Sequence, residues 1–186
     1  ESIFPSKSRK KGSLRIMLLD LSTYFTNETG TGEYGVLEPP FGLMALLTYA
    51  NREFGDRIDG KIYKSRIDFD SLDDLGKLVD EFCPEVIGIR AMTFYKELFQ
   101  DVTTYLRKRG IAVPIIAGGP HPTGSYNDVL EDKNVDIAVI SEGEITFSRI
   151  IEIILSRDED LMDQNVLRGI KGIAFSRLNN RIRQNT

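Results

Sequence analysis

Short runs of apolar residues, separated by longer amphipathic segments, dominate the pattern of this chain. A nearly continuous apolar run predicts a strand that is covered on both faces, as the strands of parallel sheets are. Such runs predict five strands, at residues 14–20, 58–63, 86–92, 114–118 and 136–141, of which the second is the weakest.

The segments between these runs have the spacing of helices. Ser71 is predicted to cap the helix that follows it, and Pro39-Pro40 suits the first turn of another helix. The pattern predicts helices at residues 41–51, 71–82, 96–109, 125–131 and 144–156. Strands that alternate with helices at this period need right-handed crossovers between parallel strands. The expected fold is therefore an α/β domain with a doubly wound five-stranded parallel sheet.

One such domain with short appendages is expected. Residues 1–13 are predicted to form a flexible basic leader, 14–160 the α/β domain, and 161–186 a linker and a small C-terminal β-hairpin that lead to an absent C-terminal domain. The hairpin is predicted from two short runs around an Asn-rich turn. The long polar loop at 21–38 is expected to be functional or mobile.

Composition narrows the classes of function. The chain has 186 residues, with 24 basic against 28 acidic side chains and a formal charge of -4, and it lacks the clustered basic face of nucleic-acid-binding proteins. The basic cluster Lys7–Lys11 fits either a solvated leader or an electrostatic contact with a partner. No apolar run reaches the ~18 residues of a membrane span, and no segment has the pattern of a signal peptide. A cytoplasmic setting is expected.

Cys83 is the single cysteine, so the chain has no internal disulfide and cannot alone hold a cluster that needs several thiolates. Because Cys83 precedes Pro84 at the foot of an apolar strand, we expect a buried structural thiol. The glycine-rich dinucleotide and P-loop motifs and the Gly-x-Ser-x-Gly elbow of serine hydrolases are missing.

The carboxyl ends of parallel strands meet at one edge of the sheet, where ligands bind in open α/β folds. At this edge Gly118-Gly119 permits the close approach of a flat or bulky ligand, or forms a simple turn. His121, the only histidine, lies between two prolines and is expected to project from a stiff loop. Because it lacks partners for a metal site, a role as polar wall or hydrogen-bonding group is favoured.

The charged residues at this edge leave alternatives open. Glu142-Gly143-Glu144 precedes a helix, where capping of free amides is favoured over acid/base chemistry. Arg90 lies in a run that should be buried, so its charge needs a partner. It either reaches the edge and meets a phosphate or carboxylate, or pairs with Asp20 or Glu142.

Three segments together resemble a known family. They are Pro84-Glu-Val-Ile-Gly-Ile89, Pro114-Ile-Ile-Ala-Gly-Gly-Pro-His-Pro-Thr123 and Val135-Asp-Ile-Ala-Val-Ile-Ser-Glu-Gly-Glu-Ile-Thr146. They are similar to the amino-terminal cobalamin-binding domain of cobalamin-dependent radical S-adenosylmethionine enzymes, and Pro39-Pro-Phe-Gly-Leu43 is similar to the opening of the first helix of that domain. The resemblance implies a flavodoxin-like sheet of order 2-1-3-4-5. This sheet would hold the corrinoid at its carboxyl edge, with the nucleotide tail beside strands one, three and four.

The resemblance also implies a partner and a set of site residues. The partner is a C-terminal radical S-adenosylmethionine barrel of the same polypeptide, which would bind S-adenosylmethionine and an iron-sulfur cluster through Cys-x-x-x-Cys-x-x-Cys; that motif is absent here. The chain alone is expected to be a non-catalytic part of a methyltransferase or cyclase, with no catalytic or metal-binding residue of its own. The residues expected at the cofactor are Ser22, Thr23, Arg90, Ala91, Met92, Thr93, Gly118, Gly119, Pro120, His121, Thr123, Ser141, Glu142, Gly143 and Glu144.

The chain departs from the family pattern at two places. Asp20-Leu-Ser-Thr-Tyr-Phe25 has no histidine where Asp-x-His-x-x-Gly would supply the lower cobalt ligand, and Arg90-Ala-Met92 replaces a small Ser-x-Leu-type segment. These departures leave a second hypothesis, a domain without cofactor that acts as a scaffold or docking module. A third hypothesis is a flavodoxin-like module for another anionic ligand or a receiver-type signalling domain, although the third strand lacks the Asp that receiver domains need at its end.

Overall fold

The computed structural model describes residues 12–26, 38–131, 133–176 and 182–185. Nearly all of the predicted leader lies outside these ranges, as do most of the loop predicted at 21–38 and the turn of the predicted hairpin. No helix in the described part of the chain is long and apolar enough to cross a membrane.

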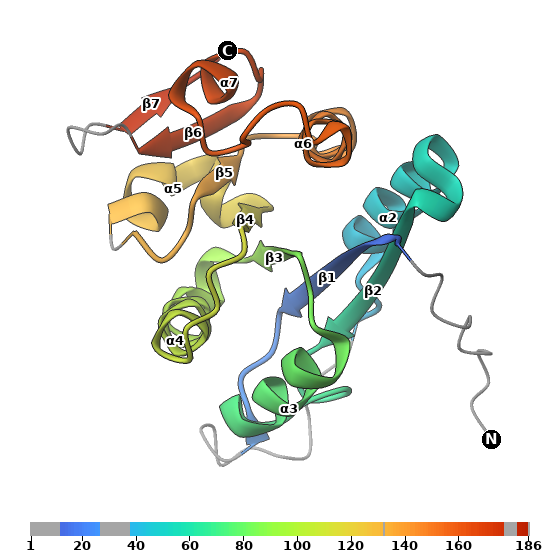
Figure 1. Cartoon of the computed structure of the whole chain (residues 1–186). Helices are drawn as coiled ribbons and strands as arrows, with labels where there is room; N and C mark the ends of the chain where they lie inside the picture. Colours follow the sequence, from blue (N-terminus) through green and yellow to red (C-terminus); the bar gives the residue numbers. More distant parts are fainter. Residues whose placement is uncertain (1–11, 27–37, 132, 177–181, 186) are drawn as a thin grey trace.

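Parallel strands form the centre of the fold (Figure 1). They are β1 (Leu14–Leu21), β2 (Ile58–Lys64), β3 (Val86–Ala91), β4 (Ile115–Gly118) and β5 (Ile137–Val139). Their order is β2-β1-β3-β4-β5, and each neighbouring pair is parallel. The predicted order is confirmed, and the sheet changes winding direction between β1 and β3.

The predicted hairpin belongs to the same sheet. β6 (Ile173–Ser176) runs antiparallel to β5, and β7 (Ile182–Gln184) runs antiparallel to β6, which makes a mixed sheet of seven strands among the described residues. The sheet is therefore wider than the five strands expected. Ile173, Ala174 and Phe175 are fully buried. This strand gains burial by pairing with the edge of β5, whose backbone groups would otherwise be unpaired.

Helices cover both faces of the sheet. α3 (Leu72–Phe82), α4 (Lys96–Lys108) and α5 (Pro120–Glu131) pack on one face, and α2 (Phe41–Phe54), α6 (Glu144–Ser156) and α7 (Gln164–Arg168) pack on the other. Two short 3₁₀ helices, η1 (Gly55–Arg57) and η2 (Thr93–Tyr95), complete these elements. Along β1, Met17 and Leu19 face the first layer while Ile16 and Leu18 face the second. The doubly wound α/β architecture is confirmed.

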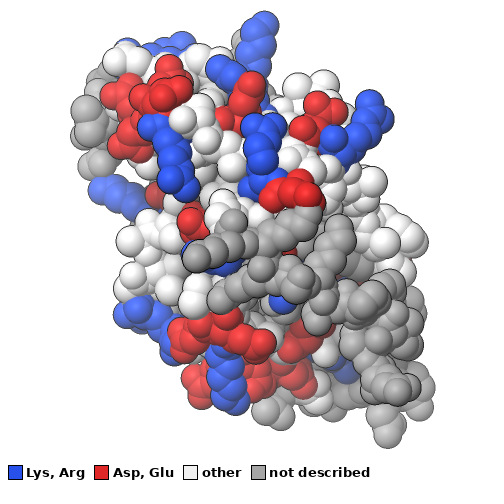
Figure 2. Space-filling view, turned by 45° about the vertical axis from the view of Figure 1, so that its right-hand side comes forward, with Lys and Arg blue, Asp and Glu red and all other residues white. Residues whose placement is uncertain are grey.

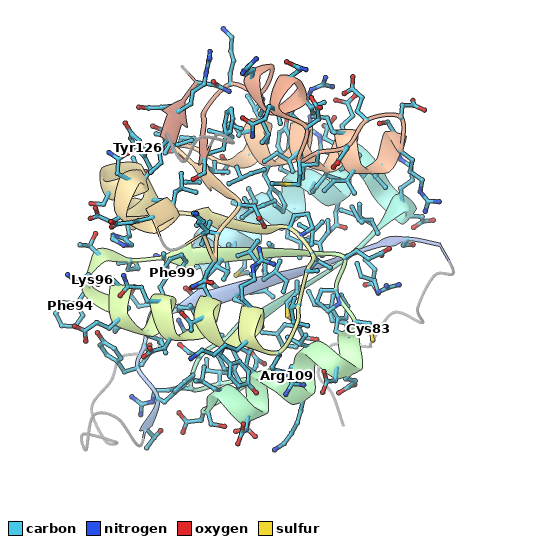
Figure 3. All side chains as sticks on the ribbon, turned by 60° about the vertical axis from the view of Figure 1, so that its left-hand side comes forward. Cys83, Phe94, Lys96, Phe99, Arg109 and Tyr126 are labelled. Carbon is cyan, nitrogen blue, oxygen red and sulfur yellow. The ribbon has the colours of Figure 1, made fainter. Side chains whose placement is uncertain are left out.

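Two local details differ from the sequence predictions. α5 begins at Pro120, five residues earlier than predicted, because proline suits the first helical position; the helix is kinked at Ser125. Cys83 is exposed rather than buried. It ends α3 in a left-handed conformation with a φ of 50°, so the chain turns there and Pro84 takes the buried position. Figure 3 shows Cys83 at the opposite end of the molecule from Phe94.

Arg107 joins α4 to the amino ends of β4 and β5. Its guanidinium donates to three backbone carbonyls and to Asp136 Oδ2 at 2.6 Å. The same carboxylate oxygen accepts from the backbone N–H of Ile115. One side chain therefore satisfies a group of acceptors at the end of the sheet that lies away from the carboxyl edge.

We expect Arg107→Ala to lower the free energy of unfolding by about 2–4 kcal/mol, because it leaves a partly buried carboxylate and several carbonyls without a donor. Arg109→Ala is the matched control, since Arg109 lies at the end of the same helix, α4, and pairs with the exposed Asp80. Arg109→Ala should lower the free energy of unfolding much less. Urea denaturation measures both variants, and equal losses would contradict the anchoring role of Arg107.

Candidate functional site

A cavity of about 400 Å³ opens at the carboxyl edge, between the sheet and helices α2 and α6. The wall formed by the sheet and α6 includes Leu18, Ile116 and Phe147, and the α2 wall includes Leu43 and Leu46. These side chains are apolar, whereas the rim carries polar groups from the strand ends. The cavity therefore suits a ligand with an apolar body that enters from the carboxyl edge.

Glycines make room for this cavity. Gly118 lies at a position whose neighbour along its strand, Ile116, faces the α2/α6 layer. The space beside Gly88, which also lines the cavity, is filled by Leu18, since a β-carbon there would lie 2.6 Å from Leu18 Cδ2. A β-carbon at Gly118 or at Gly42 would meet no atom within 4 Å, so the space beside both residues is open. At Gly119, whose φ is 99°, a β-carbon would lie 3.0 Å from the carbonyl oxygen of Ala91. Glycine at 119 is therefore required by the backbone, whereas glycine at 118 leaves volume free.

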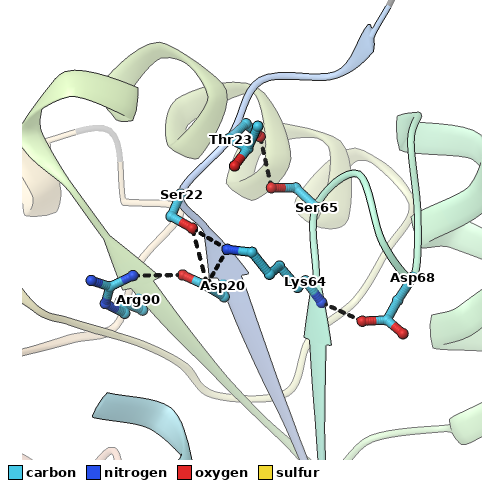
Figure 4. Close-up of polar contacts among 7 residues, drawn as sticks. All are labelled: Asp20, Ser22, Thr23, Lys64, Ser65, Asp68 and Arg90. Carbon is cyan, nitrogen blue, oxygen red and sulfur yellow. Dashed lines mark hydrogen bonds and ion pairs between the residues drawn. The ribbon is translucent and has the colours of Figure 1, made fainter. Parts of the chain in front are cut away.

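A row of charged residues crosses three strands at the same edge (Figure 4). The register places Lys64 of β2 and Arg90 of β3 on either side of Asp20 of β1. Asp20 Oδ2 lies 2.7 Å from Lys64 Nζ, and Asp20 Oδ1 lies 2.9 Å from Arg90 Nη1. Ser22 donates its hydroxyl to Asp20 Oδ2 and accepts a hydrogen bond from Lys64. Of the alternatives left open for Arg90, the structure shows the pairing with Asp20.

These three charges differ in their contact with water. The side chains of Asp20 and Lys64 are 0% and 3% exposed, whereas that of Arg90 is 27% exposed and lines the cavity. A buried carboxylate needs charge compensation and filled hydrogen-bond positions, which this row supplies. Arg90 is the member of the row that also faces the site.

Ser141 closes the rim beside β5. It has a left-handed backbone with a φ of 65°, which is uncommon for a residue other than glycine. Its N–H donates to Thr123 Oγ1 at 3.0 Å, so α5 holds the turn in place. Glu142 and Glu144 follow at the start of α6 and line the same cavity.

The structure brings together nine of the residues expected at the cofactor. They line the cavity and are Arg90, Gly118, Gly119, Pro120, Thr123, Ser141, Glu142, Gly143 and Glu144. The others lie elsewhere. Ser22 belongs to the charged row, and the carbonyl of Thr23 accepts from Ser65. Ala91 packs in the opposite core layer, and Met92 and Thr93 lead into the 3₁₀ helix η2.

His121 does not project into the site as expected. Because α5 starts at Pro120, the imidazole lies inside the protein, 5% exposed, with its ring centroid 6.2 Å from that of Phe99. Figure 3 shows Phe99 on α4. The His121 Nδ1 atom is buried and has no hydrogen-bond partner among the described residues. His121 therefore belongs to the packing between α4 and α5 rather than to the cavity lining.

The sequence reasoning missed the contribution of α2 and the role of Lys64. Gly42, Leu43 and Leu46 form one side of the cavity. The Pro39-Pro-Phe-Gly-Leu43 motif was the available signal, because it marked the start of this helix without assigning it to the site. Lys64 had no comparable signal, since its partner is 44 residues away in the sequence.

On the face shown in Figure 2, Lys and Arg side chains are interspersed with Asp and Glu. Within the described ranges, no group of three His, Cys, Asp or Glu side chains is arranged to hold a metal ion.

Comparison with known proteins identifies the family of this fold and site. The family model of the B12 binding domain matches residues 29–151, so the chain belongs to this family and the expected relationship is confirmed. An uncharacterized methyltransferase, PH0819, of Pyrococcus horikoshii is 27% identical over 142 residues, covering 76% of this chain and 28% of that protein. The anaerobic magnesium-protoporphyrin IX monomethyl ester cyclase of Synechocystis is 28% identical over 152 residues, covering 75% of this chain and 26% of that protein.

Solved structures share the fold. OxsB, a cobalamin-dependent S-adenosylmethionine radical enzyme with aqua-cobalamin and S-adenosylmethionine bound, superimposes with a TM-score of 0.71 at 14% identity, over 94% of this chain and 22% of OxsB. The radical S-adenosylmethionine methyltransferase TsrM of Kitasatospora setae, with cobalamin and a [4Fe-4S] cluster bound, gives 0.70 at 17% identity, over 93% of this chain and 29% of TsrM. The chain thus spans less than a third of the length of each of these relatives.

We expect Asp20→Asn to destabilise the fold by about 3–5 kcal/mol, because Lys64 would remain buried without a carboxylate. Asp80→Asn is the control, since Asp80 pairs with Arg109 on the surface and should change stability little. Urea unfolding of both variants tests this. A stability of Asp20→Asn close to that of the wild type would contradict the role assigned to the row.

His121 should make stability depend on pH. Burial lowers the pKa of His121 below 6.5, with Lys96 acting in the same direction and Asp128 opposing it. As the pH falls below about 6.5, the unfolded chain takes up a proton that the folded chain resists, so folding stability should fall. In His121→Leu this component should disappear. Unfolding free energies at pH 7.5 and pH 5 measure it, and the same pH dependence in both proteins would contradict it.

Proposed function

We propose that this domain binds cobalamin, with the nucleotide tail in the cavity beside β1, β3 and β4 and the corrin ring over the carboxyl edge of the sheet. The observation that carries the proposal is the glycine-lined cavity at the end of the parallel strands. Open space beside Gly118 and Gly42 and apolar walls formed by Leu43, Ile116 and Phe147 fit an aromatic base and its ribose. Membership of the B12-binding family supports the same ligand.

The residues around the cavity would share the work of holding this cofactor. Gly118 and Gly119 would lie against the tail, while Ser141 and Thr123 fix the rim near the corrin ring. When bound, cobalamin supplies a cobalt centre that can carry an alkyl group. The chain would position this group and shield the tail from water.

We further propose that this domain does not ligate cobalt through a histidine. The only histidine of the chain, His121, is buried against Phe99, and Ser22 occupies the place of the histidine in the Asp-x-His-x-x-Gly pattern. Ser22 is itself engaged by Asp20 and Lys64. Binding would therefore rest on the tail and on contacts of the corrin ring with the edge of the sheet.

The partner that fits this domain is a radical S-adenosylmethionine barrel of the same polypeptide. The relatives extend well beyond the matched region, and the names of OxsB and TsrM describe radical S-adenosylmethionine enzymes. A cluster-binding Cys-x-x-x-Cys-x-x-Cys motif does not occur in these 186 residues. In this proposal the radical chemistry of a methyltransferase or cyclase takes place on that barrel, and the present domain presents the corrinoid to it in the cytoplasm.

We expect the purified chain to retain hydroxocobalamin after desalting, as measured by its visible absorbance. Gly118→Leu should abolish this retention, because the new side chain would fill the open space in the cavity. Gly124→Leu is the matched control: it replaces a glycine with open space beside it that is exposed and outside the cavity lining, so retention should persist.

Unfolding curves and circular dichroism of both variants would establish that they fold. A wild-type chain that retains no corrinoid would reject cobalamin binding and favour a scaffold or docking role. Retention by a folded Gly118→Leu variant would instead show that the tail does not use this cavity.

A further inference from the structure

We infer that Arg90 recognises the phosphodiester of the nucleotide tail and makes this domain selective for corrinoids that carry the tail. The inference rests on the proposed cobalamin function and names the chemical group that Arg90 would contact. The observation that supports it is the charge of the row formed by Asp20, Lys64 and Arg90 at the carboxyl edge.

The row holds more positive than negative charge. One carboxylate, that of Asp20, contacts two cations, Lys64 and Arg90. Asp20 and Lys64 are almost completely buried, so the surplus charge cannot be solvated at their positions. It is accessible only at Arg90, which is 27% exposed and lines the cavity. An anionic group placed there would complete the neutralisation of the row.

The positions of the charged residues that line the cavity indicate where that anion would lie. Among its lining residues Arg90 is the single cation, while the acidic residues Glu142 and Glu144 belong to the opposite side, at the start of α6. An anion is therefore repelled from the α6 side and attracted to the β3 side. In the nucleotide tail the base and the ribose are uncharged, and the phosphodiester is the anionic group.

Arg90 is prepared for this contact by its ion pair. Its Nη1 atom donates to Asp20 Oδ1 at 2.9 Å, which restrains the position of the guanidinium (Figure 4). A guanidinium has further N–H donors in the same plane, and these suit phosphate oxygens. Because the side chain is already ordered, binding would lose little side-chain entropy. The arginine is thus a specificity-determining residue of the site rather than only a structural partner of Asp20.

The test compares two corrinoids on the full chain: hydroxocobalamin, which has the tail, and dicyanocobinamide, which lacks the nucleotide. We expect the wild type to prefer hydroxocobalamin. Arg90→Gln should lower the affinity for hydroxocobalamin about ten- to hundredfold, which is the range of a charge-assisted hydrogen bond. The affinity for dicyanocobinamide should stay unchanged. Arg90→Lys, which keeps the charge but loses the planar fork, should recover part of the preference.

Controls separate recognition from folding. Asp20 keeps Lys64 and Ser22 in Arg90→Gln, so this variant should fold. Arg109→Gln removes the same charge from an exposed pair with Asp80 and should leave both affinities unchanged. The phosphorus resonance of bound hydroxocobalamin gives a direct readout, since its shift from the free position should be reduced in Arg90→Gln.

The outcomes are distinguishable. The inference would be overturned if Arg90→Gln lowered the affinity for both corrinoids equally. It would also be overturned if the phosphorus resonance of bound hydroxocobalamin were the same in Arg90→Gln and in the wild type. Either result would leave the proposal of cobalamin binding intact. Tighter binding of hydroxocobalamin by Arg90→Gln would also overturn the inference, because the arginine would then obstruct the tail. If the wild type binds neither corrinoid, the proposed function fails and the inference falls with it.

Discussion

Asp20 places a carboxylate at a point in the sheet that water does not reach. Removing an ionised group from water costs several kcal/mol unless partners replace the lost hydration. The chain supplies these partners from both neighbouring strands, Lys64 from β2 and Arg90 from β3, and adds the hydroxyl of Ser22. A displacement of either strand by one residue would turn these side chains to the other face of the sheet and break the row. The electrostatic requirement at Asp20 therefore helps to fix the register at the edge where the site forms.

The open space at the same edge of the sheet depends on a residue without a side chain, Gly118. Gly118 occupies a position of β4 that faces the α2/α6 layer, and Ile116, two residues before it, fills that layer with an apolar side chain. At Gly88 of β3 the side chain of Leu18 fills the space instead. Packing is thus complete near the centre of the sheet and open toward its carboxyl edge. Because α2 and α6 form the other walls, the cavity depends on elements that are distant in the sequence but share one face of the sheet.

The general architecture could be predicted from local patterns. Apolar runs separated by helical spacing predicted the five parallel strands and their right-handed crossovers, whereas the strand order came from the resemblance to the cobalamin-binding family. The family-specific segments around Gly118 and Gly143 located one side of the cavity. The hairpin was also recognised, but its docking was not, since pairing of β6 with β5 depends on the burial of Phe175 in one core layer and of Ala174 in the other.

The remaining features depend on long-range geometry that one sequence does not reveal. Arg90 had two candidate partners, and only the register of β1 with β3 distinguished Asp20 from Glu142. His121 was expected at the ligand edge because the prolines around it suggested a stiff loop. The helix that starts at Pro120 instead turns the imidazole toward Phe99. A shift of a few residues in the start of a helix is enough to move a side chain between a ligand site and the core.

The positions of His121 and Arg90 bear on which contacts would contribute to the affinity for a corrinoid. In the proposed function no histidine–cobalt bond contributes, so binding would rest on the nucleotide tail and on contacts of the corrin ring with the edge of the sheet. In this proposal shape and charge would act on different parts of the tail: the open space beside Gly118 would accept the uncharged base and ribose, whereas Arg90 would meet the phosphodiester. In this proposal the phosphodiester would balance the positive charge that the row carries beyond the negative charge of Asp20. An arginine that departs from the small residue of the family pattern is therefore consistent with tail binding, provided that Asp20 holds it against the wall of the cavity.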